Sequence, residues 1–273
     1  MSRVDTPAQL QETRAAFDSV AAVYDGPRGN NELIQDMRTE MWAVLDATFP
    51  EPARLLDLGC GTGLDAVRMG AQGHSITATD WSGGMTAQTS ARARQAGMSE
   101  RVQTLNIGAQ ELDRIANAHP YDGAYSNLGP LNCVPDLGPV ARECARLIKP
   151  GGALVFTVIG RICPWEVVHY AFKRRWSRLA VRYARDVVPV SMNNRTIWTR
   201  YYTPREFYRP FAPYFALQTL RGLCLFAPPP YITWVRDRHL RWYNALWRLD
   251  RRVSGWPLLR SMGDHFLLVL TRR

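Results

Sequence analysis

The chain has 273 residues and a formal net charge of +10, a length that suits one domain with insertions and a full hydrophobic core. Its five cysteines follow no C-x-x-C or metal-ligand spacing, which argues against a disulfide framework or a metal site and favours free thiols. No apolar run approaches the roughly 20 residues of a membrane span, and the N-terminal segment has no signal-peptide pattern, so we expect a cytoplasmic protein.

The charge is unevenly divided along the chain. Residues 161–273 carry 21 basic and 6 acidic side chains, whereas residues 1–160 carry 13 and 18. Such an excess is typical of proteins that meet an anionic ligand, a nucleic acid or an anionic membrane. All basic residues except Lys149 and Lys173 are arginine, a skew that genome composition also produces, so charge alone does not choose the partner.

Two helical patterns precede the first strand. Residues 17–25 place Phe17 and Tyr24 on one apolar face, which either packs on the core or covers a ligand pocket. Residues 32–48 form a second helix that prolines end, and Arg38 lies beside its apolar stripe, where we expect it to be solvated; the alternative is that it reaches toward the pocket. That stripe consists of Leu33, Met37, Met41 and Leu45.

An apolar run then opens into glycines at alternate positions, Leu55-Leu56-Asp57-Leu58-Gly59-Cys60-Gly61-Thr62-Gly63. This pattern predicts a buried parallel strand that turns sharply into a helix from about Leu64. Glycine permits positive φ and lets a ligand approach the backbone, and the N–H groups at the helix start favour a polar or anionic group. The third glycine comes one residue too early for the dinucleotide fingerprint.

A second apolar strand over residues 75–79 ends in Asp80, whose carboxylate can accept hydrogen bonds from both hydroxyls of a ribose. Together, the acid-x-G-x-G-x-G motif from Asp57 to Gly63 and this acid resemble the class I S-adenosylmethionine-dependent methyltransferases. The resemblance covers residues 14–160 well and implies S-adenosyl-L-methionine as cofactor and S-adenosyl-L-homocysteine as product.

The resemblance also implies contacts to that cofactor. In small-molecule members, a segment like residues 17–25 covers the pocket, and its tyrosine borders the cofactor. Trp81, which either joins the core or stacks on adenine, is assigned to adenine by resemblance. The implied contacts so far are Tyr24, Asp57, Gly59, Cys60, Gly61, Gly63, Asp80, Trp81 and Met85.

Two further strands lead into the same region. Family members place an aspartate for the adenine amino group after the third strand, residues 102–107, but this chain has Gly108 and Ala109 there. We expect the backbone groups of Gly108 and Ala109 to contact adenine, and Gln110 is our substitute acceptor for the amino group. After the fourth strand, residues 121–127, ligands gather at the carboxyl ends of a doubly wound sheet. We therefore assign Asn127 to the cofactor, with a turn role as the alternative, and Asn132 to the substrate; no His or Asp supports Cys133 as a nucleophile.

Beyond the fifth strand, residues 153–159, the pattern changes. The pattern of residues 164–187 predicts one basic amphipathic helix. It could be an ordinary surface helix, a cap over the active site or a patch for an anionic membrane, and its position after the fifth strand favours a cap. One side carries Phe172, Trp176, Leu179 and Tyr183, and the other carries Arg174, Arg178, Arg182 and Arg185.

The first turn of that helix holds the candidate catalytic pair. Glu166 and His169 share a face, so the carboxylate could orient the imidazole as a general base, although a surface pair is the favoured interpretation. Trp165 and Tyr170 are candidate substrate contacts. No metal site is expected.

The remaining patterns complete an α/β fold. Residues 196–202 suit a strand of a small hairpin, Thr203 begins a capped helix, and residues 216–220 and 265–270 are strands around a Trp- and Arg-rich helical insertion. We predict a doubly wound, Rossmann-like, seven-stranded sheet that is mostly parallel with an antiparallel last strand, plus helical cap insertions. Its parts are N-terminal helices (1–50), the cofactor core (51–160), a cap (161–202) and the end of the core with a second insertion (203–273).

The favoured function is methyl transfer to a small-molecule acceptor, at an O, N or C atom, that is aromatic or hydrophobic and in some cases anionic. Methylation of a nucleic acid is the alternative, motivated by the basic half, but Ser126-Asn127-Leu128-Gly129-Pro130 stands where DNA amino-methyltransferases carry [D/N/S]-P-P-[Y/F/W]. A third possibility is a non-catalytic cofactor-binding or lipid-surface protein, with peripheral membrane contact.

Overall fold

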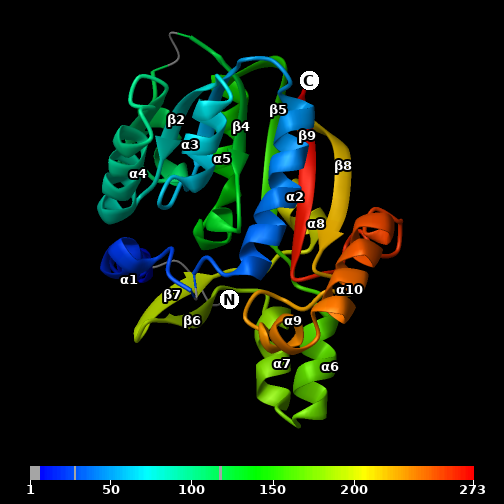
Figure 1. The fold of residues 1–273 in the computed structure, drawn as a ribbon. Coiled ribbons are helices and arrows are strands. Elements are labelled where there is room, and N and C mark those ends of the chain that lie inside the picture. Colours follow the sequence, from blue (N-terminus) through cyan, green and yellow to red (C-terminus); the bar gives the residue numbers. More distant parts are fainter. Residues whose placement is uncertain (1–6, 28, 117–118) are drawn as a thin grey trace.

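A computed structural model describes residues 7–27, 29–116 and 119–273, and a seven-stranded sheet runs through it (Figure 1). The strand order is β3-β2-β1-β4-β5-β9-β8, in which β9 pairs antiparallel with both β5 and β8 and the other pairs are parallel. The predicted fold class is confirmed. The strands are β1 (Arg54–Leu58), β2 (Ser75–Thr79), β3 (Val102–Leu105), β4 (Tyr121–Ser126), β5 (Ile148–Ile159), β8 (Phe215–Leu223) and β9 (His265–Arg272).

The sheet is buried on both faces, because neighbouring residues of a strand point to opposite sides. Leu55 packs with α2 (Glu32–Thr48), α3 (Leu64–Ala71) and α4 (Gly83–Gln95) on one face. Leu56 packs with α5 (Leu137–Leu147), the short α8 (Pro204–Tyr208) and the 3₁₀ turn η2 (Ala109–Arg114) on the other. The apolar run of β1 is continuous because this strand is central in the sheet and covered on both faces.

Local sequence signals place the helix starts. The predicted stripe of α2 is fully buried, and Asn31 caps the helix by accepting from the Leu33 and Ile34 N–H groups. Ser82 caps α4 through the Met85 N–H, and Thr203 and Glu206 form the expected capping box of α8.

The insertions gather at the carboxyl ends of the parallel strands, in the lower part of Figure 1. Helices α6 (Pro164–Phe172) and α7 (Trp176–Tyr183) form a hairpin, followed by the strands β6 (Val188–Met192) and β7 (Arg195–Thr199). The β6–β7 hairpin lies against α1 (Pro7–Val20), where the Trp198 N–H donates to Thr13 Oγ1 at 3.0 Å. The second insertion holds α9 (Trp234–Arg238) and α10 (Leu240–Val253).

The single amphipathic helix expected over residues 164–187 is wrong. Arg174 has φ 51°, which breaks the helix into α6 and α7, so the faces before and after it fall out of phase. The predicted polarity also fails, since Phe172 is 90% exposed whereas Arg182 is only 5% exposed. Trp176 and Tyr183 are exposed as well, and the side chains of Arg178 and Leu179 lie outside the described part.

None of the helices in the described residues is long and apolar enough to cross a membrane.

Candidate cofactor and active site

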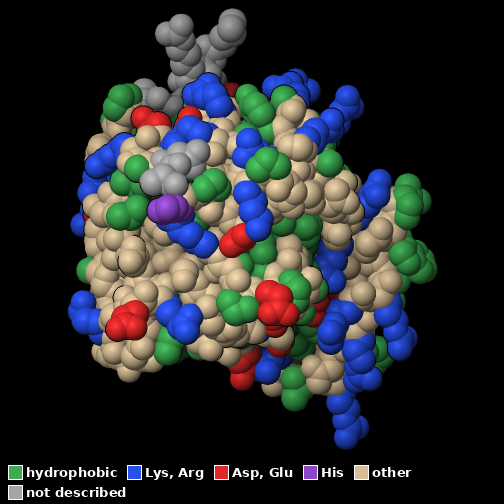
Figure 2. Space-filling view, turned by 90° about the horizontal axis from the view of Figure 1, so that it is seen from above, with side chains coloured by type: hydrophobic (Ala, Val, Ile, Leu, Met, Phe, Trp, Pro, Cys, Tyr) green, Lys and Arg blue, Asp and Glu red, His purple; other side chains and the backbone are tan. Residues whose placement is uncertain are grey.

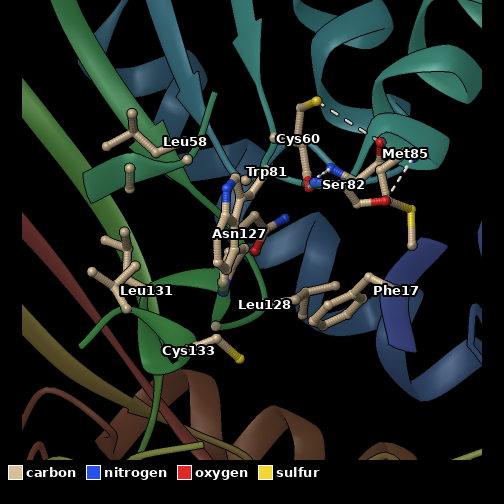
Figure 3. A pocket seen from close by; sticks show the side chains of 18 of the residues that line it. Phe17, Leu58, Cys60, Trp81, Ser82, Met85, Asn127, Leu128, Leu131 and Cys133 are labelled. Carbon is tan, nitrogen blue, oxygen red and sulfur yellow. Dashed lines mark hydrogen bonds between the residues drawn. The ribbon is translucent and has the colours of Figure 1, made fainter. Parts of the chain in front are cut away.

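A cavity of about 270 Å³ lies where the parallel strands end. The segments after β1, β2, β3 and β4, together with Ile159 at the end of β5, form its floor, while α1, Tyr24 and the β6–β7 hairpin lie over it. Figure 3 shows the side chains of Leu131 and Cys133, from the 3₁₀ turn η3 (Pro130–Cys133), on one side of the space and those of Phe17 and Met85 on the other.

The glycine turn holds its shape through positive φ angles of 78°, 55° and 83° at Gly59, Gly61 and Gly63. Its glycines serve different purposes. A Cβ at Gly61 would meet nothing within 4 Å and would enter the cavity, which leaves the backbone open to a ligand. A Cβ at Gly63 would lie 2.8 Å from Thr89 Cγ2, so that glycine lets α3 pack closely on α4.

Asp80 projects from the end of β2 beside this turn. Its carboxylate accepts from the Gly61 N–H at 3.0 Å and from the Ser82 N–H at 2.8 Å, which fixes its orientation. Burial raises the pKa of Asp80 to about 6, although these two backbone donors act in the opposite direction. Each oxygen keeps a lone pair for a further donor, so the group can hold a diol.

The next part of the wall is flat and aromatic. Trp81 follows Asp80, and Asn106 Nδ2 donates to the carbonyl oxygens of both residues at 2.9 and 3.0 Å. Gly108, Ala109 and Gln110 also line the cavity here. A planar heterocycle fits between an indole and a backbone segment of this kind.

A cation lies on the other side of the glycine turn. Arg38 Nη1 donates to Asp65 Oδ2 at 2.5 Å, and its Nε, which is buried, has no hydrogen-bond partner among the described residues. Asp65 also accepts from Trp42 Nε1 at 2.7 Å and from Asn127 Nδ2 at 3.1 Å, while Asn127 Oδ1 accepts from Thr157 Oγ1 at 2.9 Å. The expectation that Arg38 is solvated is wrong: its side chain is 11% exposed and lines the cavity.

The far part of the cavity is apolar. Met192, Ile197 and Thr199 reach it from the β6–β7 hairpin and face Val134 and Ile159 from the sheet side. Met192 also packs against the cluster of Val20, Ala21 and Met85, together with Phe17 and Tyr24. The hairpin, which the sequence indicated only as a strand of uncertain place, thus supplies part of the site.

The titratable groups near this apolar part are held in their neutral forms. Burial raises the pKa of the Cys133 thiol to about 11 and raises the pKa of the Tyr24 phenol as well, although Arg38 partly opposes the shift at Tyr24. The described lining of the cavity contains no histidine, lysine or glutamate. In the described part of the chain, no group of three or more His, Cys, Asp or Glu side chains is arranged to hold a metal ion.

Comparisons with known proteins agree with this geometry. Residues 55–152 match the family model of the methyltransferase domain. The chain is 33% identical over 150 residues to the ubiquinone biosynthesis O-methyltransferase of Alkalilimnicola ehrlichii, a match that covers 54% of this chain and 59% of that one. It is 31% identical over 159 residues to the demethylmenaquinone methyltransferase of Clavibacter sepedonicus, a match that covers 57% of this chain and 61% of that one.

The core is a class I S-adenosylmethionine-dependent methyltransferase domain. The match spans about three fifths of the length of these curated relatives.

Solved structures show the same fold at low identity. The 1,6-didemethyltoxoflavin-N1-methyltransferase of Burkholderia thailandensis superposes with a TM-score of 0.59 at 19% identity, covering 100% of this chain and 92% of that one. DhpI superposes with a TM-score of 0.61 at 13% identity, covering 98% and 100%.

Most of the residues that the sequence assigned to the cofactor line the cavity. Asp57 and Gly63 do not. Asp57 is 2% exposed beneath the turn, where burial raises its pKa well above the usual range, and Gly63 faces Thr89. Those that do line it are Tyr24, Gly59, Cys60, Gly61, Asp80, Trp81, Met85, Gly108, Ala109, Gln110 and Asn127.

The residues assigned to catalysis and substrate lie outside the cavity lining. Glu166 does not orient His169, because Arg182 binds its carboxylate at 2.6 and 3.0 Å. Trp165 donates its Nε1–H to the Phe226 carbonyl, which holds its ring against the second insertion. The segment expected to be the first turn of a cap is instead the base of the α6–α7 hairpin. Tyr170 belongs to that hairpin and contacts the ring of His169.

Asn132 is a structural bracket. It is fully buried, and its Nδ2 donates to the carbonyl oxygens of Ile159 and Arg200 at 3.0 and 2.7 Å. Its Oδ1 accepts from the Ile159 N–H at 2.9 Å, so both amide hydrogens and the oxygen bind the backbone, and the side chain is not part of the cavity lining.

Several lining residues were missed by sequence reasoning. Asp65 carried a signal, because an acid in the first turn of the helix after the glycine turn faces the same space. Met192 and Ile197 carried none, since their place depends on how the hairpin folds back over the sheet.

Proposed function

We propose that the chain transfers the methyl group of S-adenosyl-L-methionine to a small, largely apolar acceptor, at an O, N or C atom. The observation that carries this proposal is one continuous cavity with a polar part at the glycine turn and an apolar part under the β6–β7 hairpin. We propose that residues 1–50 and 161–202 cover the cofactor core of 51–160, which residues 203–273 complete.

The polar part fits the cofactor group by group. The free lone pairs of Asp80 suit the ribose hydroxyls, and Trp81 with the backbone from Gly108 to Gln110 suits adenine. At the other end, Arg38 has an unused buried N–H that suits the carboxylate of the methionyl group. The bound cofactor would supply an activated methyl group on its sulfonium.

The acceptor would occupy the apolar part. Val134, Ile159, Met192 and Ile197 favour an aromatic or aliphatic body, in line with the quinone-pathway names of the curated relatives. The cation Arg14 also lines the cavity, but it lies 5.9 Å from the Trp81 ring, in the cofactor part, and pairs with Asp18 at 4.0 Å.

The protein's part in the chemistry is positioning. Holding the acceptor in line with the methyl group and excluding water lowers the barrier by roughly 7–11 kcal/mol. The Tyr24 and Cys133 hydrogens stay in place at neutral pH because burial raises both pKa values, so neither group is a base there. We therefore expect acceptors that lose their proton readily, such as phenols with a low pKa, to be the better substrates.

Calorimetric titration with S-adenosyl-L-homocysteine tests the cofactor assignment. We expect binding by the parent chain and a loss of roughly 10–100-fold in affinity for Asp80→Ala, because a charge-assisted bond to a diol disappears. Asp113→Ala, an exposed acid on η2, is the matched control and should bind like the parent. No binding by the folded parent chain would overturn the proposal.

Release of S-adenosyl-L-homocysteine then tests the acceptor class. Phenolic, amine and carbon-acid acceptors are compared with generic RNA, which represents the nucleic-acid alternative motivated by the basic half. Turnover with RNA alone would favour that alternative, and cofactor binding without turnover on any acceptor would favour a non-catalytic protein. The free thiols of all five cysteines suit a reducing compartment, so we propose a cytoplasmic location.

A further inference from the structure

The turn between α6 and α7 carries an unusual set of exposed side chains. The segment Phe172-Lys173-Arg174-Arg175-Trp176, here called the hairpin tip, is exposed at every position. Phe172 and Trp176 are 90% and 64% exposed, and Val168, one helical turn before Phe172 on the same face of α6, is 67% exposed. Three apolar side chains thus stand in water around three consecutive basic residues.

No acidic side chain of the described residues pairs with the positive charges of the tip. Lys173, Arg174 and Arg175 form no ion pair with any described residue. The nearest acid of the same hairpin, Glu166, is held at its base by Arg182. The tip therefore presents a local field that attracts anions together with apolar surface that leaves water favourably.

A buried cluster fixes the base of the hairpin. Arg182 binds Glu166 at 2.6 Å, donates to the Gly160 carbonyl at 2.7 Å and pairs with Asp264. Gly160 follows β5 and Asp264 precedes β9, so the hairpin is tied to two neighbouring strands of the sheet. Figure 1 shows α6 and α7 extending beyond the β6–β7 hairpin, away from the sheet.

We propose that the hairpin tip docks on an anionic lipid surface, with Phe172, Trp176 and Val168 entering the headgroup region and the basic residues meeting lipid phosphates. Aromatic side chains favour the membrane interface, and basic residues add attraction to anionic lipids. The exposed apolar side chains extend along α6 from Phe172 to Val168. A hydrated phosphodiester backbone would not cover this apolar surface, whereas the headgroup region of a bilayer would. The tip is also a projection, which suits a plane better than it suits a peptide in need of a groove.

This docking does not rest on the proposed function, but it would have a consequence for it. The cavity and the hairpin lie at the same end of the sheet, since Ile159 lines the cavity and α6 begins at Pro164. A docked chain would turn the cavity end toward the bilayer, where apolar acceptors dissolve.

Sedimentation of the full chain with vesicles tests the proposal. One set contains phosphatidylcholine alone, and the other contains phosphatidylcholine mixed with phosphatidylglycerol. We expect binding to the mixed vesicles only, a loss of at least tenfold for Phe172→Ser with Trp176→Ser, and a loss of about fivefold for each of Lys173→Gln and Arg175→Gln. High salt should weaken binding of the parent chain.

The matched control is Trp256→Ser with Arg260→Gln, an exposed aromatic and an exposed arginine in a different turn, which should leave vesicle binding unchanged. Thermal unfolding and S-adenosyl-L-homocysteine affinity of all variants should match the parent, so a folding defect is recognised independently. Equal binding to both vesicle types, no binding at all, or unchanged binding by the tip variants would overturn the proposal. Salt-sensitive retention on RNA without vesicle binding would assign the surface to nucleic acid.

Discussion

The cofactor end of the cavity and the α6–α7 hairpin respond in opposite ways to the same physical rules. Around the glycine turn, apolar side chains lie inside and polar groups face the cavity, so Leu55 and Leu56 are fully buried and Gly61 lines the cavity. In the hairpin, Phe172 stands in water and Arg182 is buried. A pattern of polarity predicts burial only where the core that receives the apolar face is part of the same chain.

The physical reason is the number of neighbours each element has. Helices cover both faces of strand β1, so its side chains are buried whichever face they point to. The hairpin touches the rest of the protein mainly at its base, where a cation is satisfied by two carboxylate partners, whereas the apolar side chains at its tip are exposed. Under the proposed lipid docking, these exposed aromatic side chains would be covered by a partner outside the chain.

The largest expected effect is at the hairpin base. Arg182→Ala leaves the carboxylates of Glu166 and Asp264 buried without their cation, so we expect the free energy of unfolding to fall by about 3–5 kcal/mol. Urea denaturation measures the change. Arg185→Ala, which removes an exposed arginine just after α7, should cost no more than about 0.5 kcal/mol. Equal effects of the two would mean that the cluster does not anchor the hairpin.

The glycine turn offers a matched pair of substitutions. Gly63→Ala places a Cβ 2.9 Å from Thr89 Cα, so we expect a loss of about 2–4 kcal/mol in the free energy of unfolding. Gly61→Ala meets no atom and should cost about 1–2 kcal/mol from its φ alone, yet its methyl group enters the cavity and should weaken S-adenosyl-L-homocysteine binding. Full affinity in the Gly61 variant would show that the ligand does not approach the turn.

Cofactor binding should depend on pH through Asp80. The ionised carboxylate accepts the ribose hydroxyls, and its pKa in the free protein is raised to about 6, so protonation competes with binding below that pH. Affinity should be constant above pH 6 and fall by up to about tenfold per pH unit below it. Calorimetry at several pH values measures this, and Asp80→Asn should bind weakly at every pH. A flat profile in the parent chain would contradict the assignment.

The smallest expected effect is local to one helix start. Thr203→Ala removes the side-chain acceptor for the Glu206 N–H in the capping box of α8, which should lower the free energy of unfolding by about 1 kcal/mol. Thr39→Ala, on the exposed side of α2, should change it by less than about 0.5 kcal/mol in the same denaturation experiment. A larger effect at Thr39 than at Thr203 would contradict the role of the cap.

The sheet, the helix starts and the cofactor end of the site could be predicted from the sequence alone. Apolar runs, caps and the glycine turn act over a few residues, and Asp80 follows directly from its place at the end of β2. The roles of residues that depend on distant partners could not be predicted in this way, because they follow from tertiary contacts. Arg38 points inward because it pairs with Asp65, which lies 27 residues away in the sequence. Asn132 joins the backbone of β5 to that of Arg200, and Glu166 binds Arg182 and not His169. The acceptor part of the cavity belongs to the same class, because Met192 and Ile197 reach it only when the β6–β7 hairpin folds back against α1.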